Sequence, residues 1–352
     1  MGLTELLAKI TPFDRDAYDQ CIYHFDHIAK PVGSLGKLET LLAAIAGASG
    51  DPFLDISKRC VLVFCADNGV LAQGVAQSTH DVTTAIAHSL AHKTTSVNAM
   101  AMACSTDVFP IDMGMIDTVE GLIPCSVAKG TNDMTLAPAM TKEQALQAIL
   151  TGVEMVEKRV HEGYRLIATG EAGIGNTTTS SAILSVLLDV PVEQVTGRGS
   201  GLSDDGLIRK QTAIKKAIEK NQPDSSDILD VLSKIGGFDI AGMVGAFLGG
   251  ALYHVPVIMD GFISGVAALC AVKLCPFVKD YILPSHISAE PAGRMLMQAL
   301  GFEPVIHADM RLGEGTGAVA LIPLLDLALS VYKNAASFDD IQVEAYKKWK
   351  SN

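Results

Sequence analysis

Residues 164–184 read YRLIATGEAGIGNTTTSSAIL, and this stretch predicts the fold of the chain. The apolar run at 166–168 is typical of a buried strand, and glycines follow it at 170, 173 and 175. Hydroxyl side chains at 177–181 then lead into an apolar helix. A strand, a glycine loop and a helix N-terminus in this order predict an anion site, because unpaired N–H groups and the helix dipole favour negative charge.

Glu171 lies inside this predicted loop. A carboxylate is a poor ligand for phosphate, so we expect Glu171 to face a sugar hydroxyl or a reacting group. The alternative interpretation is an ordinary glycine turn with a solvated acid. Three later stretches, 194–206, 255–269 and 304–317, repeat the combination of glycines with polar side chains, which favours one shared ligand site.

The later stretches supply further candidates. Arg198 and Ser200 lie in a glycine loop, where a guanidinium suits phosphate or carboxylate, although a tight loop between helices explains the same pattern. Asp260 ends an apolar run that predicts a strand. Glu314 lies in a three-glycine turn at a helix start, and a helix-capping acid is the alternative.

Alternating apolar runs and helical segments predict an α/β fold with a Rossmann-like parallel sheet flanked by helices. Polar residues at the carboxyl ends of such strands are where open α/β sheets bind ligands. Strands are expected in 59–70, 106–115, 166–168, 255–260 and 304–310. Helices are expected in 1–30, 30–47, 73–90, 141–163, 207–220, the first part of 240–259, and a charged tail, 338–350, that holds Trp349 and packs on the N-terminal helices.

Composition narrows the class of protein. Of 352 residues, 49% are hydrophobic and 19% are charged, which predicts a compact, well-buried chain. A net charge of −12 argues against partners such as nucleic acid or an anionic membrane surface. The uncharged run 240–259 has membrane-spanning length, but its glycines, His254 and Pro256 favour a buried helix followed by a strand.

Seven cysteines without zinc-type spacing predict reduced thiols in a cytoplasmic protein, and the N-terminus predicts an amphipathic helix instead of a signal peptide. His80, His88 and His92 are spaced for one helix face, but no acid or cysteine completes a metal site, so no metal is expected. Lys30 and Lys37 flank a Pro/Gly turn, where they either approach an anion or are solvated.

Four motifs occur in the order KPVGSLGKLE (30–39), GEAGIGNTT (170–178), TGRGSG (196–201) and RLGEGTGA (311–318). On these motifs the chain resembles the nicotinate-nucleotide–dimethylbenzimidazole phosphoribosyltransferase family. The resemblance implies a large Rossmann-like domain (45–326), a small helical domain from both chain ends (1–44 and 327–352), and a dimer. It also implies that ribose 5-phosphate moves from nicotinate mononucleotide to an aromatic base for cobalamin synthesis, with inversion at C1′ and without a cofactor.

The resemblance also assigns roles to residues. Glu314 matches the family's general base, and Glu171 matches the glutamate near the ribose and the incoming base. The nucleotide and its phosphate would be held at Gly173, Gly175, Asn176, Thr177, Thr178, Gly201, Ser264 and Gly265. The pocket for the aromatic base would include Ser78, Ile86 and Leu312.

Several positions depart from the family's usual residues. Asn68 stands where histidine is common, Ala172 where methionine is usual, and Ala292-Gly293 where Gly-His is common. The helix start around Ile86 lacks a glutamine that often contacts the base. We expect these changes to cluster at the pocket for the aromatic base, which leaves the reaction class intact and the acceptor open.

Two alternatives follow from these departures. A related branch of the family transfers ribose phosphate to phenol or p-cresol as a heterodimer of two homologous chains, and a more apolar pocket would suit such an acceptor. This chain would then be the catalytic half. A non-catalytic, nucleotide-binding partner subunit is the other alternative, and the presence of both Glu171 and Glu314 argues against it.

Overall fold

The computed structural model describes residues 2–346 and contains a six-stranded sheet in the order β3-β2-β1-β4-β5-β6. Every neighbouring pair of strands is parallel, which confirms the predicted Rossmann-like sheet. The strand order reverses between β1 and β4, and open α/β sheets bind ligands at such a point. The strands are β1 (Arg59–Ala66), β2 (Asp107–Gly114), β3 (Ile123–Pro124), β4 (Leu166–Ala172), β5 (Val257–Met259) and β6 (Ile282–Pro284).

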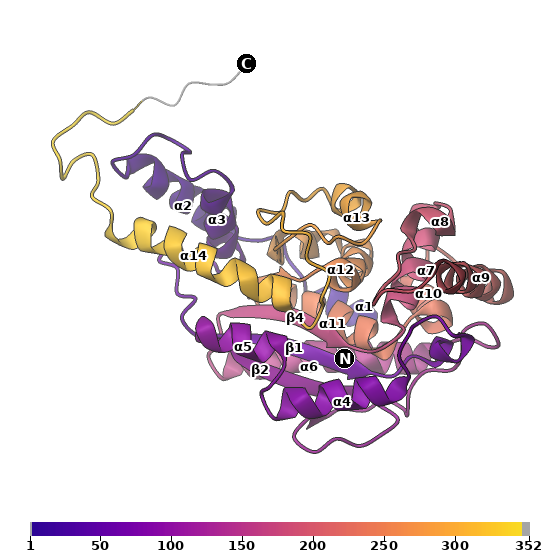
Figure 1. The fold of residues 1–352 in the computed structure, drawn as a ribbon. Coiled ribbons are helices and arrows are strands. Elements are labelled where there is room, and N and C mark those ends of the chain that lie inside the picture. The colour runs from indigo at the N-terminus through magenta and orange to yellow at the C-terminus, as the bar shows by residue number, and fades with distance from the viewer. Residues whose placement is uncertain (1, 347–352) are drawn as a thin grey trace.

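Helices cover both faces of the sheet, and each face has its own hydrophobic core (Figure 1). The first core holds α1 (Leu3–Leu7), α6 (Lys142–His161), α7 (Asn176–Leu188), α8 (Val192–Val195), α9 (Asp204–Asn221), α10 (Ile228–Ile235), α11 (Phe238–Leu252), α12 (Phe262–Leu274), η2 (Pro276–Tyr281) and α13 (Gly293–Leu300). The second holds α2 (Arg15–His27), α3 (Lys37–Ser49), α4 (His80–Ala91), α5 (Ser96–Ala103) and α14 (Thr316–Asn334). A short 3-10 helix, η1 (Gly69–Gln73), follows β1.

β1 divides its side chains between the two cores because successive residues of a strand point to opposite faces. Leu62 and Phe64 belong to the first core, whereas Val61 and Val63 belong to the second. All eight residues of β1 are buried. The strand therefore lies at the centre of the protein, and its carboxyl end is a fixed platform for the loops above it.

Helix α14 runs from the sheet to the α2–α3 pair, so these two N-terminal helices and the last helix of the chain meet at this side of the molecule (Figure 1). The Ala29 N–H bonds to Ala336 O over 2.8 Å, and the Phe338 N–H bonds to His27 O over 3.1 Å. Helix α1 packs on the opposite core through Leu6. The division into a large and a small domain remains a prediction.

Two predicted elements were wrong. Residues 304–310 form no strand: only a single bridge joins Ile306 to His286, and β6 takes the expected place in the sheet. Residues 338–346 form no helix, because Ser337 and Asp340 bond to each other's backbone in a local turn and Phe338 is the one buried side chain there. Trp349 lies outside the described residues.

The other predictions of burial were confirmed. Residues 240–259 form most of buried α11, followed by β5, and the seven cysteines are free thiols. Within residues 2–346, α14 is the one helix long and apolar enough to cross a membrane. Half of its apolar stretch is buried inside the protein, where it contributes to the second core. Lys30 is not available to an anion, because it pairs with buried Glu39 over 2.7 Å.

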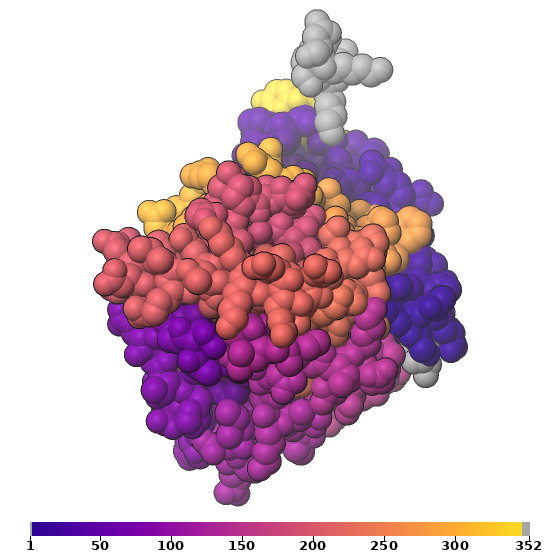
Figure 2. Space-filling view, turned by 90° about the vertical axis from the view of Figure 1, so that its right-hand side faces the viewer, coloured from indigo at the N-terminus to yellow at the C-terminus, as the bar shows by residue number. Residues whose placement is uncertain are grey.

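The end of the molecule beside the glycine loops is covered by helices. Figure 2 shows the segment that includes α9 and α10 spread across this face, above the residues that lead into α6. Helix α9 packs on α7, the helix that begins at the glycine loop. This contact brings a buried side chain of α9 to the candidate site, as described below.

Candidate active site

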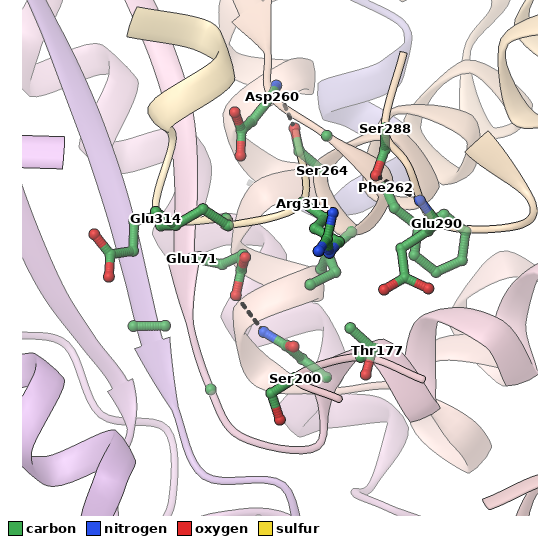
Figure 3. Close-up of a pocket in the computed structure, with 18 of the residues that line it drawn as sticks. Glu171, Thr177, Ser200, Asp260, Phe262, Ser264, Ser288, Glu290, Arg311 and Glu314 are labelled. Atoms are coloured by element: carbon green, nitrogen blue, oxygen red, sulfur yellow. Dashed lines mark hydrogen bonds between the residues drawn. The ribbon is translucent and has the colours of Figure 1, made fainter. Parts of the chain in front are cut away.

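A cavity lies at the carboxyl ends of β4, β5 and β6, beside the point where the strand order reverses. About 1020 Å³ of empty space lies among its lining residues, including the part open to solvent. Its walls come from the loops after these three strands and from the loops 198–200 and 311–314 (Figure 3). These five separate stretches of sequence therefore meet at one cavity.

The glycine loop predicted from residues 164–184 is present, but the strand before it is longer than expected. β4 continues through Ala172, so Glu171 lies on the strand, and residues 173–175 alone connect it to α7. Gly175 has φ of 100°, a conformation that favours glycine. The N–H groups of Asn176 and Thr178 already bond inside the turn, so an anion here also needs a cationic side chain.

Glu171 is buried and lines the cavity. The Asn176 amide donates to Glu171 Oε2, an interaction marked in Figure 3. Burial raises the pKa of Glu171 well above its ordinary value, and the charges of Asp239, Asp260 and Glu314 raise it further. This environment favours the protonated acid, so Glu171 is suited to donate a hydrogen bond.

Glu314 lies in the loop before α14 with φ of 63°, between two glycines that also have positive φ. Its side chain is half-buried, and Oε2 accepts a hydrogen bond from the Val97 N–H of α5 over 3.3 Å. Burial raises the pKa of Glu314, whereas the Val97 N–H lowers it. A carboxyl group poised in this way is suited to accept a proton near neutral pH.

Asp260 holds the loop that carries Glu314. Its carboxylate accepts the backbone N–H groups of Gly315 over 3.3 Å and Ala318 over 2.9 Å, so it caps α14. Burial raises the pKa of Asp260, and the neighbouring His286 imidazole opposes that shift. Asp260, a candidate site acid from the sequence, therefore fixes the position of the Glu314 loop. The helix cap expected as the alternative for Glu314 is supplied by Asp260.

Basic side chains lie in and behind the opposite wall of the cavity, beside Glu290. Lys210 of α9 is fully buried, and its Nζ donates to Thr177 Oγ1 over 2.8 Å. Burial lowers the pKa of Lys210 to about 8. Lys210 lies behind the wall, whereas Arg198 and Arg311 line the cavity, and Figure 3 shows Arg311 between Glu171 and Glu290. The sequence showed Lys210 only as part of a basic helix.

The structure brings most of the predicted site residues to this one cavity: Glu171, Gly173, Gly175, Asn176, Thr177, Ser264, Leu312, Glu314 and Ile86. Their roles remain predictions. The hydroxyl of Ser264 is already engaged, since it bonds to Thr169 Oγ1 over 2.7 Å and accepts the Asp260 N–H over 3.2 Å. Ser264 thus joins β4, β5 and α12 and has little capacity left for a phosphate.

Four predicted site residues lie away from the cavity. Thr178 is fully buried inside α7, and Gly265 packs against Leu296 of α13. Gly201 and Ser78 line two separate neighbouring hollows. The motifs predicted these residues because they belong to segments that reach the site. Which residues of a segment face the cavity depends on tertiary packing, which the motifs do not show.

We expected the departures from the family pattern to cluster at one pocket, but not all of them do. Ala172 and Ile86 line the cavity. Asn68 is buried below it, beside Gly173 and Gly175. Residues 292–293 lie at the start of α13 and do not line the cavity.

The fold and the cavity define a class of protein: a Rossmann-like α/β enzyme whose cavity is lined by carboxyl groups and a glycine loop, with a buried lysine behind the loop. The chain belongs to the phosphoribosyltransferase family whose model matches residues 10–343.

Relatives with known names are similar over nearly the whole chain. The nicotinate-nucleotide–dimethylbenzimidazole phosphoribosyltransferase of Acetivibrio thermocellus is 44% identical over 98% of this chain and 99% of its own length. The enzyme of the same name from Halalkalibacterium halodurans is 40% identical over 96% of each chain. The crystal structure of that enzyme from Thermus thermophilus superposes with a TM-score of 0.87 at 33% identity, over 94% of this chain and 99% of that one.

Proposed function

We propose that this chain transfers ribose 5-phosphate from nicotinate mononucleotide to dimethylbenzimidazole, with inversion at C1′. The observation that carries the proposal is one cavity lined by Glu171 and Glu314 on one side and by Thr177 on the other, with the buried Lys210 ammonium bonded to the Thr177 hydroxyl from behind. The named activity of relatives that match almost every residue supports the choice of substrates.

The phosphate of the nucleotide would lie at Thr177 and Lys210. The Thr177 hydroxyl, which accepts from Lys210, can donate to a phosphate oxygen, while the Lys210 charge behind it and Arg311 in the cavity wall favour an anion. Arg198 also lines the cavity, but its guanidinium pairs with Asp204. Lys210 is charged below about pH 8, where its pKa lies. From this anchor the ribose would extend toward Glu171, whose protonated carboxyl group can donate to a sugar hydroxyl.

The aromatic base would lie between Glu314 and the apolar side chains of Val75, Ile86 and Leu312. Its unprotonated ring nitrogen attacks C1′ from the face opposite nicotinate. A new C1′–N bond forms while the bond to nicotinate breaks, and the bonding electrons leave on the nicotinate nitrogen. The second ring nitrogen of the base loses its proton to the Glu314 carboxylate. Alignment of the reactants and this base supply the catalysis.

A phenolic acceptor is the second candidate. Ile86 and Ala172 both line the cavity and offer no polar side chain to a second ring nitrogen, which suits phenol or p-cresol. The proposal keeps dimethylbenzimidazole because the names of the similar enzymes support it.

An acceptor panel tests the function. Purified protein is incubated with nicotinate mononucleotide and, separately, dimethylbenzimidazole, adenine, phenol or p-cresol, and nicotinate release is followed. We expect the fastest turnover with dimethylbenzimidazole. Turnover with phenols alone would assign the phenolic branch, and no release with any acceptor, alone or with a homologous chain added, would overturn the proposal.

We further propose that the protein works in the cytoplasm as a homodimer and without a resident cofactor. Free cysteine thiols support a reducing compartment. Light scattering of the purified chain tests the homodimer. A monomer that becomes active only with a homologous chain would support the heterodimer instead.

A further inference from the structure

A third carboxyl group lies directly behind Glu171. Asp239, in the first turn of α11, is fully buried and does not line the cavity. It shares one amide with Glu171, because Asn176 Nδ2 donates both to Glu171 Oε2 and, over 3.1 Å, to Asp239 Oδ2. We propose that Asp239 is a positioning residue for the phosphoribosyl transfer, which acts through Asn176 to hold the Glu171 carboxyl group. This inference rests on the proposed function for its kinetic test.

The physical argument starts from the amide. The NH₂ group of Asn176 has two hydrogens, one for each carboxyl group, while its oxygen can only accept. The two ends of an amide have almost the same shape, so hydrogen bonds decide which way it points. Without Asp239, Asn176 can turn and present its oxygen to Glu171. With Asp239, the nitrogen faces Glu171 and Oε2 acts as an acceptor.

The orientation of Asn176 decides which oxygen of Glu171 carries the proton. Since Oε2 accepts from the amide, the proton of the neutral acid belongs on Oε1. That oxygen lies at the loop before α14: a Cβ added to Gly313 would be 2.6 Å from it. Asp239 therefore directs the Glu171 hydrogen-bond donor toward the side of the cavity where Glu314 is carried.

Asp239 is itself held firmly. Its Oδ1 accepts the Ile240 N–H over 2.9 Å, and a Cβ on Gly237 would lie 2.5 Å from the same oxygen. The Asn68 amide is buried beside Asp239 and makes no hydrogen bond of ordinary geometry within the described residues. Because the buried Asp239 side chain cannot swing out into solvent, it can hold the Asn176 amide in one orientation.

Charge acts in the same direction. The titratable or charged groups that face Glu171 are Asp239 from α11, Asp260 after β5, Glu314 and Arg311 from the loop before α14, and Cys65 from β1. Burial raises the pKa of Asp239 to about 6, so it is mostly ionised at neutral pH. Its negative charge favours the protonated form of Glu171.

Two substitutions separate position from charge. Asp239→Ala removes both, and we expect kcat to fall roughly tenfold or more, while KM for nicotinate mononucleotide changes less than about threefold, because a misplaced catalytic group costs up to about 10²-fold. Asp239→Asn keeps an acceptor oxygen but removes the charge. We expect one limb of its pH–kcat profile to move to lower pH by roughly one unit, since a like charge near Glu171 is gone.

Asp230→Asn is the matched control. Asp230 is another buried, hydrogen-bonded carboxylate, but it bonds to residues of α6 and α10 and does not line the cavity. Its loss should lower stability without moving the pH profile. If the parent enzyme is active and both Asp239 variants keep its kcat and pH profile, the inference is overturned while the proposed function stands.

A direct measurement does not depend on turnover. Protein labelled with ¹³C at glutamate carboxyl carbons reports the titration of Glu171, assigned by the signal lost in Glu171→Gln. We expect that signal to titrate at lower pH in Asp239→Asn than in the parent. An unchanged titration would contradict the inference even if every acceptor fails, whereas an inactive parent with a shifted titration would count against the proposed function only.

Discussion

Gly170 and Glu314 pack backbone against backbone: a Cβ added to Gly170 would lie 2.3 Å from the Glu314 carbonyl oxygen. The turn that carries Glu314 therefore rests directly on β4, one residue before Glu171. This contact, together with the Asp260 cap, sets the position of the two acids relative to each other. It explains why the middle of a buried strand contains a glycine.

The first prediction concerns this contact. Gly170→Ala should push the Glu314 loop off the strand, lowering kcat by at least about tenfold and stability by about 1–3 kcal/mol through overpacking. Steady-state kinetics and thermal unfolding measure the two effects. Gly249→Ala is the control, because its Cβ would press on Val153 and Val156 of α6, which do not line the cavity. Wild-type kinetics in Gly170→Ala would contradict the account.

The second prediction concerns the phosphate. Lys210→Met should raise KM for nicotinate mononucleotide by about 10–100-fold, since a hydrogen bond to a charged group contributes about 1.5–3 kcal/mol, and should leave kcat less affected. Lys215→Met, on the exposed side of the same helix, should leave KM unchanged. Equal effects from the two substitutions would remove Lys210 from the phosphate site.

The pH dependence of binding follows from the same lysine, and its direction can be stated. Burial lowers the pKa of Lys210 to about 8, so its charge is present below that pH and is lost above it. The kcat/KM for nicotinate mononucleotide should therefore fall as pH rises through about 8 in the parent enzyme. In Lys210→Met this fall of kcat/KM above about pH 8 should be absent. If the fall remains in the variant, a group other than Lys210 causes it.

The fold was predictable where the pattern of apolar residues determines it. β1 and α11 come from long apolar runs, β4 begins with a short apolar run, and the glycine loop follows from its own residues. The run 304–310 failed as a strand because residues 307–309 are exposed and Asp309 has φ of 50°. β6 is only three residues long, too short to stand out in the sequence.

The site was predictable in part. Glu171 and Glu314 follow from motifs, but Asp239 is fixed by tertiary packing that no local pattern reveals. Lys210 did leave a signal. Ala213, Ile214 and Ala217 are buried on the same face of α9, at spacings of three, four and seven residues, so Lys210 occupies a core position of the helix. A lysine in such a position requires a polar partner.

The third prediction separates the structural and functional effects of Asp260. Asp260→Ala should cost about 1 kcal/mol of stability through loss of the α14 cap and should also lower kcat, since the Glu314 loop loses its anchor. Thr141→Ala removes a cap of similar strength from α6, far along the chain from the site. We expect it to reduce thermal stability to a similar extent with kcat unchanged. Unaltered kcat in Asp260→Ala would show that the cap does not position Glu314.

The fourth prediction concerns metals. Within residues 2–346 no group of three or more acidic, histidine or cysteine side chains is arranged to hold an ion. Dialysis against a chelator should leave nicotinate release unchanged, measured with and without added Mg²⁺ or Zn²⁺. A loss of activity that a divalent ion restores would contradict the proposed mechanism.

The most direct test of the central claim is the turnover of Glu314→Gln with nicotinate mononucleotide and dimethylbenzimidazole. A general base contributes about 10²–10⁴-fold to rate, so the account predicts a fall of about that size in kcat, while calorimetry shows nucleotide binding retained. The acid limb of the pH profile that reports Glu314 should vanish with it. A variant that keeps kcat within about tenfold of the parent would contradict the claim that Glu314 is the base.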